Sequence, residues 1–176
     1  MRIRPEQTVA VGIDFQEKLV PAMHGSDELI AKSQTLLAGL RVLNIPVCLT
    51  QQYTKGLGMS LPSIFEAAGT DSHTDKLRFS AFEDIKPFLA GKKYVVVLGI
   101  EAHVCVLQTI VDLAENGYIP VLAADCVTSR RPESVAIALQ RARDEGAVIT
   151  NCESILFELL QTAGTDASKQ IQKLIR

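Results

Sequence analysis

The chain has 176 residues, of which 47% are hydrophobic and 22% charged, and its formal net charge is −2 at pH 7. This length suits one core, so we expect a single domain over residues 1–176. The small net charge and the lack of a long Lys/Arg block argue against nucleic acid or an anionic membrane as the main partner. No apolar run is long enough to cross a bilayer.

The N-terminal residues lack the long apolar segment of a targeting signal, and we expect a cytoplasmic protein. The four cysteines, Cys48, Cys105, Cys126 and Cys152, show no C-x-x-C spacing. We therefore expect thiols rather than disulfides, and we interpret Cys48 as a core residue.

Residues 9–14 are a short apolar run that ends in Asp14, a pattern typical of a buried strand. Open α/β sheets bind ligands at the carboxyl ends of their strands, which makes Asp14 a candidate site residue. The alternative is an aspartate that caps the following turn. A helix is predicted over residues 26–44 and a second strand over residues 46–52.

Residues 53–75 contain glycines, a proline and polar side chains without periodicity. They predict a long connection that carries a binding loop or lid, and we expect substrate specificity to lie there. Lys76 follows in a predicted short strand, ahead of a helix over residues 83–89. A lone lysine is usually a solvated surface charge, so Lys76 gains weight only from its neighbours.

Residues 95–106 combine a branched apolar run with a glycine and then a cysteine. The run predicts a strand buried on both faces, and apolar positions at helical spacing predict a helix over residues 104–115. Cys105 would lie in or near the first helical turn, where unpaired N–H groups favour a thiolate. The alternative is a small buried structural thiol.

The remaining chain predicts a strand over residues 119–125 with Asp125 at its carboxyl edge, a helix from Pro132 to Gly146 and a last strand over residues 147–150. Apolar helices follow at residues 155–160 and near the C-terminus, where the tail could pack on a partner subunit. The alternation predicts a three-layer, doubly wound α/β fold with a mainly parallel sheet of about six strands and helices on both faces. Neither G-x-G-x-x-G nor a P-loop is present.

Three motifs in this order resemble the isochorismatase-like cysteine hydrolases. They are Asp14 at the end of the first strand, Lys76 in Lys-Leu-Arg-Phe-Ser-Ala-Phe, and Cys105 in Gly-Ile-Glu-Ala-His-Val-Cys-Val. Residues 99–109 and 124–130 look most like the isochorismatase domain-containing proteins. The resemblance implies a catalytic triad in which Asp14 is the general base for the Cys105 thiol and Lys76 holds the aspartate and balances its charge.

The resemblance also implies a cis peptide bond, which here would join Ile100 and Glu101. Such a bond would aim backbone N–H groups at a developing oxyanion, and we expect the amides of Ala102 and Cys105, with Glu101 also possible, as donors. The predicted substrate and oxyanion residues are Ile100, Glu101, Ala102, Gln16 and Phe82.

Two departures from the family narrow the prediction. Nicotinamidases of this superfamily carry a metal site after the second strand, where this chain offers His73 as the only histidine, so we expect no metal and no cofactor. Members that cleave isochorismate have no cysteine at the nucleophile position. His103 stands where many relatives have a small polar or acidic residue, which leaves the surroundings of the oxyanion site open.

We therefore expect a metal-independent cysteine hydrolase that acts on a small amide-like C–N substrate through a Cys105 thioester. The alternative is a catalytically weak small-molecule-binding or interaction module on the same fold, and a redox-sensing thiol ranks last. The resemblance further implies a homo-oligomer, a dimer or higher, for which the helix at residues 155–160 could serve.

Overall fold

The computed structural model describes residues 1–176 and is built on one six-stranded parallel sheet with strand order β3-β2-β1-β4-β5-β6. Its central strands β1 and β4 are fully buried, as their continuous apolar runs predict. The strands are β1 (Thr8–Ile13), β2 (Val47–Gln52), β3 (Thr74–Lys76), β4 (Tyr94–Ile100), β5 (Ile119–Thr128) and β6 (Val148–Thr150).

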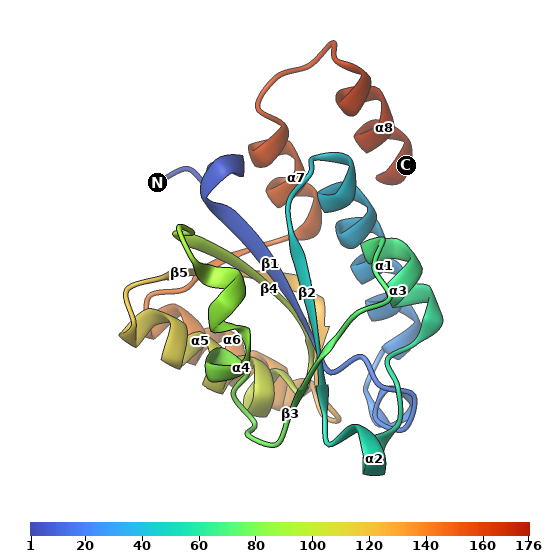
Figure 1. Cartoon of the computed structure of the whole chain (residues 1–176), viewed down its shortest axis with the longest axis vertical. Helices are drawn as coiled ribbons and strands as arrows, with labels where there is room; N and C mark the ends of the chain where they lie inside the picture. The colour runs from blue at the N-terminus through green and yellow to red at the C-terminus, as the bar shows by residue number, and fades with distance from the viewer.

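Helices cover both faces of the sheet (Figure 1). One face carries α1 (Ser26–Val42), α3 (Pro62–Ala68), α7 (Cys152–Leu160) and α8 (Asp166–Leu174), and the other carries α4 (Phe82–Leu89), α5 (Leu107–Glu115) and α6 (Pro132–Asp144). The short α2 (Thr54–Leu57), the 3-10 turns η1 (Pro5–Gln7) and η2 (Val20–Ala22), and the π-helical turn η3 (Ala102–Val106) complete the chain. The predicted three-layer, doubly wound fold is confirmed.

Strand β4 shows how the sheet divides the core in two. Its residues Val96 and Leu98 pack in a cluster of 25 buried residues with α1 and α7, while Val95 and Val97 pack in a cluster of 21 with α4 and α5. Alternate side chains of a strand point to opposite faces, so every residue of this strand is buried. No helix is both long and apolar enough to span a membrane.

The segment between β2 and β3 differs from the prediction because it contains two helices. Pro62 begins α3, and Ile64 and Ala68 are buried against α1. A helix of seven residues is too short for apolar periodicity to stand out from its sequence. Tertiary packing against α1 stabilises it instead.

Strand β5 is longer than predicted and passes through Asp125 instead of ending there. The register against β4 shifts between Val97 and Gly99, and pairing then continues to Thr128. Asp125 accepts a hydrogen bond from the Cys152 N–H (2.8 Å) and therefore connects β5 to the start of α7. The prediction that Asp125 lies at the carboxyl edge of the sheet is wrong, because a bulge of this kind has no signature in the sequence.

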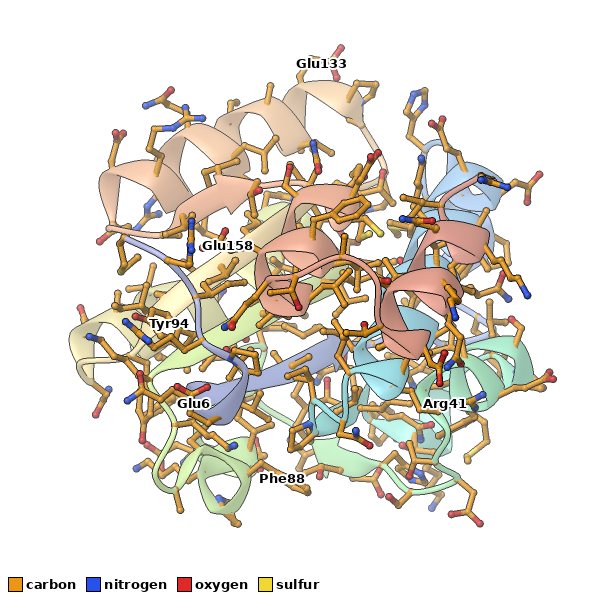
Figure 2. The ribbon with its side chains drawn as sticks, turned by 90° about the horizontal axis from the view of Figure 1, so that it is seen from above. Glu6, Arg41, Phe88, Tyr94, Glu133 and Glu158 are labelled. Carbon is orange, nitrogen blue, oxygen red and sulfur yellow. The ribbon has the colours of Figure 1, made fainter.

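The C-terminal helices pack within the chain. Ile155 and Leu156 of α7 and Ile171 of α8 are fully buried in the larger core cluster. Glu158 on the same α7 accepts a hydrogen bond from the Ile3 N–H (2.6 Å), which ties the N-terminal segment to this layer (Figure 2). Much of the apolar surface expected to meet a partner subunit therefore packs inside its own subunit, although Phe157 of α7 remains 40% exposed.

Candidate active site

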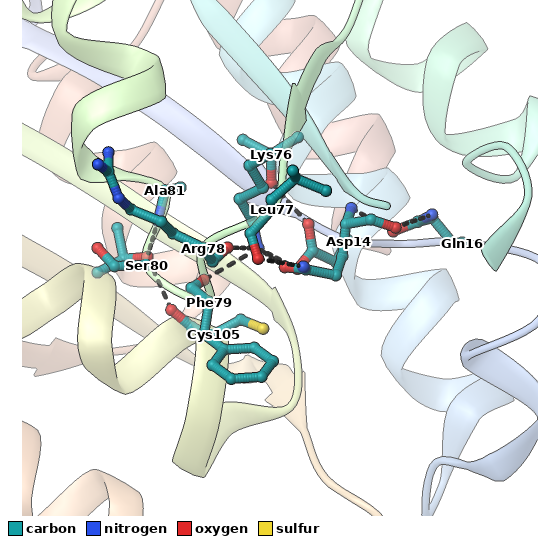
Figure 3. Close-up of polar contacts among 12 residues, drawn as sticks. Asp14, Gln16, Lys76, Leu77, Arg78, Phe79, Ser80, Ala81 and Cys105 are labelled. Atoms are coloured by element: carbon teal, nitrogen blue, oxygen red, sulfur yellow. Dashed lines mark hydrogen bonds and ion pairs between the residues drawn. The ribbon is translucent and has the colours of Figure 1, made fainter. Parts of the chain in front are cut away.

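Three predicted site residues meet at the carboxyl ends of strands β3, β1 and β4 (Figure 3). Asp14 follows β1, Lys76 is the last residue of β3, and Cys105 lies in η3 directly after β4. Lys76 Nζ lies 2.7 Å from Asp14 Oδ2, and Asp14 is close enough to Cys105 for its negative charge to raise the pKa of the thiol. Asp14 is therefore the central member of this buried group.

Asp14 is held in an unusual backbone conformation by its neighbours. Its φ of 58° lies in the left-handed region, which aspartate tolerates better than most residues. The Thr50 hydroxyl donates to Oδ1 at 2.9 Å, whereas Oδ2 has the ion-pair contact with Lys76 but no well-aligned hydrogen bond. Oδ2 thus keeps a lone pair that could accept a proton.

Lys76 is fixed by acceptors on several sides. Its Nζ donates to Gln52 Oε1 at 2.7 Å and to the carbonyl of Phe79 at 2.9 Å, with the Arg78 carbonyl at 3.3 Å. These contacts and Asp14 compensate a buried ammonium, whose desolvation would otherwise cost several kcal/mol (of order ~5). Lys76 is therefore not the solvated surface lysine that its local sequence suggests. The family motif, and not the local pattern, identified it as a site residue.

Cys105 is a protonated thiol in this environment. Burial, followed by the negative charge of Asp14, raises the pKa of Cys105 to about 12, and the positive charge of Lys76 opposes this effect. The expectation that the helical turn would favour a thiolate at Cys105 is therefore wrong for the free protein. Desolvation of a small anion outweighs one nearby cation that is already paired with a carboxylate.

The turn before Cys105 reverses the chain through a left-handed residue. Glu101 has φ of 55°, and no peptide bond in the chain is cis, so the predicted cis bond between Ile100 and Glu101 is wrong. The Glu101 carbonyl accepts from the N–H groups of Val104 (2.8 Å) and Val106 (3.4 Å). Ala102 and Cys105, whose amides we predict as oxyanion donors, lie in this same η3 turn.

The other predicted substrate residues, Gln16, Ile100 and Phe82, are buried or hydrogen-bonded within the protein. Gln16 Nε2 donates to the carbonyls of Gln52 (2.9 Å) and Gly58 (2.8 Å), and its Oε1 accepts from the Gln52 N–H (2.7 Å). Ile100 is buried in the core on the α1 face, and Phe82 is buried at the start of α4 in the cluster that contains Cys105. Gln16 and Ile100 therefore support the loops and the sheet and leave no free group for a substrate.

Three residues that the sequence did not single out position the triad: Thr50, Gln52 and Thr109. Thr109 Oγ1 donates to the Cys105 carbonyl at 2.7 Å and accepts from the Ala81 N–H at 2.9 Å. The spacing of four residues from Cys105 is a signal for this bond, because a helical threonine often donates to the carbonyl four residues earlier.

His103, Glu101 and Arg130 form a polar network beside the turn. Glu101 Oε1 lies 2.8 Å from Arg130 Nε in an ion pair, and Glu101 Oε2 lies 3.5 Å from His103 Nδ1. The same His103 nitrogen lies 2.9 Å from the hydroxyl of the buried Ser129. The side chain of Glu101 is therefore directed to Arg130 and His103, and only its backbone remains a candidate for the oxyanion site.

The site is almost closed to solvent in the single chain. Cys105 is 6% exposed, and neither it nor Asp14 lines any of the five main cavities. A cavity of about 540 Å³ reaches Lys76 from the side of the segment expected to set specificity. Its lining comprises Tyr53, Thr54, Lys55, Asp75, Lys76, Leu77, Arg78 and Asp84. No three His, Cys, Asp or Glu side chains in the chain converge as a metal-binding group.

Comparison with known proteins identifies the family. The sequence profile of the isochorismatase domain matches residues 8–154, which include all three members of the triad. The chain belongs to the isochorismatase family. Isochorismatase domain-containing protein 2 of Danio rerio is 35% identical over 99% of this chain and 89% of the relative.

Other members of the isochorismatase family have different names and lengths. Isochorismatase domain-containing protein 1 of Danio rerio is 34% identical over 99% of this chain, which spans 62% of that relative. The Secreted isochorismatase effector Isc1 of Phytophthora sojae is 34% identical over 99% of this chain and 87% of its own length. A solved structure described as the MAR1 ribonuclease of Caenorhabditis elegans superposes with a TM-score of 0.94 at 34% identity, covering 99% of this chain and 92% of that one.

Proposed function

We propose that this isochorismatase-family protein is a metal-independent cysteine hydrolase that cleaves a small amide-like C–N bond. The observation that carries the proposal is the buried ion pair of Asp14 with Lys76, whose two charges both act on the Cys105 thiol. A thiol, a nearby carboxylate base and a cation that holds the base are the parts that nucleophilic cysteine catalysis needs.

The raised pKa of Cys105 favours a mechanism in which proton transfer accompanies attack. The thiol proton passes to Asp14 Oδ2 as the sulfur attacks the substrate carbonyl carbon, so a free thiolate is never needed at rest. Lys76 then faces a neutral Asp14, and its charge is available to stabilise negative charge developing on the substrate. Backbone N–H groups of the η3 turn, those of Ala102 and Cys105, are the proposed donors to the carbonyl oxygen.

The two half-reactions balance without any further reagent. Collapse of the tetrahedral intermediate breaks the C–N bond, and Asp14 returns its proton to the leaving nitrogen, which departs as ammonia or an amine. Water then attacks the Cys105 thioester with Asp14 as base, releasing the carboxylic acid and restoring the thiol. The net reaction is amide plus water to acid plus ammonia or amine.

The test uses a panel of small amides with ammonia release and intact mass as readouts. We expect wild type to release ammonia from at least one amide and to show an acyl mass increment after acid quenching, and Cys105→Ala to show neither. Cys48→Ala is the matched control because Cys48 is a similarly buried thiol with a raised pKa outside the site. An unmodified Cys105 and no Cys105-dependent turnover across the panel would refute the proposal.

Two observations favour a second candidate, a small-molecule-binding or interaction module with little turnover. They are the near-complete burial of Cys105 and the raised pKa of its thiol. Saturable binding of a small amide with the same affinity in wild type and Cys105→Ala, without ammonia release, would support this candidate.

Because the Caenorhabditis elegans structure is described as a ribonuclease, RNA should be tested as a substrate together with the amides. A small substrate fits this chain better, because its triad is buried and its formal net charge is −2. Cleavage of a fluorescent RNA oligonucleotide that depends on Cys105 would replace the amide proposal.

We also propose that the protein is a homo-oligomer. A structure from Escherichia coli of the same fold is described as an octameric hydrolase, with a TM-score of 0.91 at 17% identity. Leu77 (77% exposed) and Phe79 lie exposed in the loop after β3, beside the site, and could be covered in such an assembly. Light scattering coupled to gel filtration measures the mass, and a monomer at micromolar concentration would contradict the proposal.

A further inference from the structure

We propose that a polar cavity next to the nucleophile turn binds an oxyanion, and that the substrate therefore carries a carboxylate or phosphate group. The cavity has a volume of about 430 Å³ and is lined by His103, Arg130, Arg131 and Ser134, with no apolar residue. The assignment of this ligand to the substrate rests on the proposed function, because it takes Cys105 as the nucleophile. The binding of an oxyanion in the cavity is independent of the proposed function.

Charge distinguishes this cavity from the other main cavities. Each of the other four has at least one acidic side chain in its lining, such as Asp75 and Asp84 in the cavity of about 540 Å³. The cavity of about 430 Å³ has two arginines and no carboxylate in its lining. After the pairing of Arg130 with Glu101, one full positive charge remains uncompensated. An anion is the ligand that this charge selects.

The two arginines are arranged to hold an oxyanion. Arg130 Nε lies 2.8 Å from Glu101 Oε1, and this ion pair positions the guanidinium while its terminal nitrogens remain free of partners. Arg131 makes no ion pair within the chain. A planar fork of donors matches the two oxygens of a carboxylate or phosphate, and an already oriented guanidinium loses less entropy on binding.

The position of the cavity relates it to Cys105. His103 lies two residues before Cys105 in the η3 turn, and α6, which begins directly after Arg131, packs against that turn. A group bound to Arg130 and Arg131 would therefore lie beside the turn that carries the nucleophile. This shared turn is the reason for assigning the oxyanion to one end of the substrate.

Binding is tested first without any turnover, with sodium phosphate and sodium succinate as probes followed by backbone NMR. We expect saturable shifts of the His103 and Ser134 amides with at least one of the two probes. Arg131→Gln should weaken that binding at least about tenfold, because a charged hydrogen bond is lost. Arg143→Gln, at the far end of the same helix, should bind as wild type does. Equal affinity in wild type and Arg131→Gln, or no shifts at these amides, would overturn the site.

The assignment to the substrate is tested with a matched pair of amides, succinamate and its uncharged analogue butyramide. Wild type should prefer succinamate in kcat/KM, and Arg131→Gln should reduce that preference at least about tenfold through KM. If phosphate or succinate binds as expected but neither amide is hydrolysed, the site stands and the proposed function fails. If RNA binds with an Arg131 dependence while phosphate and succinate do not, the cavity is a polynucleotide contact and the small-molecule assignment is overturned.

Discussion

Lys76 Nζ lies 2.7 Å from Asp14 Oδ2, and the two side chains are 0% and 1% exposed. An ion pair so fully removed from water loses the hydration of both charges, and its attraction roughly offsets that cost. Net stability is therefore not its main contribution. The pair fixes the position of one carboxylate whose charge acts on the thiol of Cys105.

Removal of one partner of the Lys76–Asp14 pair should show how strongly burial penalises the charge that is left. Lys76→Met leaves the Asp14 carboxylate buried and uncompensated, and we expect the free energy of unfolding to fall by about 3–5 kcal/mol. The double variant Lys76→Met/Asp14→Asn should recover most of this loss, since asparagine is neutral and also tolerates the φ of 58° at this position. Urea unfolding at pH 7 measures all three proteins. A single variant as stable as wild type would contradict a buried, uncompensated charge.

Asp14→Asn should separate the reactivity of the thiol from turnover. The negative charge of Asp14 raises the pKa of Cys105, so its removal lowers that pKa and alkylation by iodoacetamide at pH 9 should become faster. Hydrolysis should nevertheless fall by about 10²–10⁴-fold, because the general base is gone. Intact mass against time follows the alkylation, with Cys105→Ala as the blank. Unchanged alkylation would mean that Asp14 does not act on the thiol.

Sequence patterns predicted the sheet well because its strands are buried on both faces. Residues 9–14 and 95–98 can satisfy their apolar side chains only in a central parallel strand, and they form β1 and β4. Helix α3 and the bulge in β5 escaped prediction, since both depend on contacts between distant segments. Asp125 was misplaced for the same reason.

Family motifs located the three residues of the triad but did not predict the pKa of Cys105. Local reasoning favoured a thiolate at Cys105, whereas burial together with Asp14 raises its pKa. The burial of Cys105 depends on how η3, α4 and β3 pack together, and the sequence of one segment alone does not reveal that packing. Gln52, which holds Lys76, ends β2 at the same sheet edge as Asp14, and the rule that selected Asp14 could have selected it as well.

Gly99 should be the least replaceable glycine of the chain. Its φ is 143°, and a Cβ would lie 2.4 Å from the Ile13 carbonyl oxygen, so alanine would separate β1 from β4 beneath the site. We expect Gly99→Ala to lower the free energy of unfolding by more than about 3 kcal/mol, beyond the cost of positive φ alone. Gly91→Ala is the control, because Gly91 has φ of 71° with no atom within 4 Å of its Cβ position, and it should cost about 1–2 kcal/mol. Similar losses in both would refute the close approach.

Cys48 should contribute to alkaline unfolding without affecting activity. Burial raises the pKa of Cys48 to about 11, whereas an unfolded thiol titrates near ~8.5. The unfolded chain therefore releases this proton first, and the stability contribution present below pH ~8.5 is lost as the pH rises toward the folded pKa. Between pH 9 and pH 10, wild type should lose about 1.2 kcal/mol more than Cys48→Ala. Urea unfolding at both pH values measures the slopes, and equal slopes would exclude a buried protonated thiol at this position.

Thr109 should act on Cys105 through the backbone. Its hydroxyl donates to the Cys105 carbonyl and accepts from the Ala81 N–H, so it joins the nucleophile turn to the loop that follows Lys76. Thr109→Val keeps the shape but leaves the buried Ala81 N–H without its acceptor, and we expect a loss of about 1–3 kcal/mol in the free energy of unfolding. Thr109→Ser preserves the hydroxyl and should restore most of that loss.

The kinetics of the two Thr109 variants distinguish positioning from stability alone. If the hydroxyl holds Cys105 against Asp14, Thr109→Val should lower kcat at a temperature where the variant is fully folded, with KM little changed, and Thr109→Ser should behave as wild type does. The pH dependence of Cys105 alkylation gives a second readout, because a displaced thiol would lose part of the influence of Asp14 on its pKa. Equal kcat and equal alkylation profiles in Thr109→Val and wild type would restrict Thr109 to a role in folding.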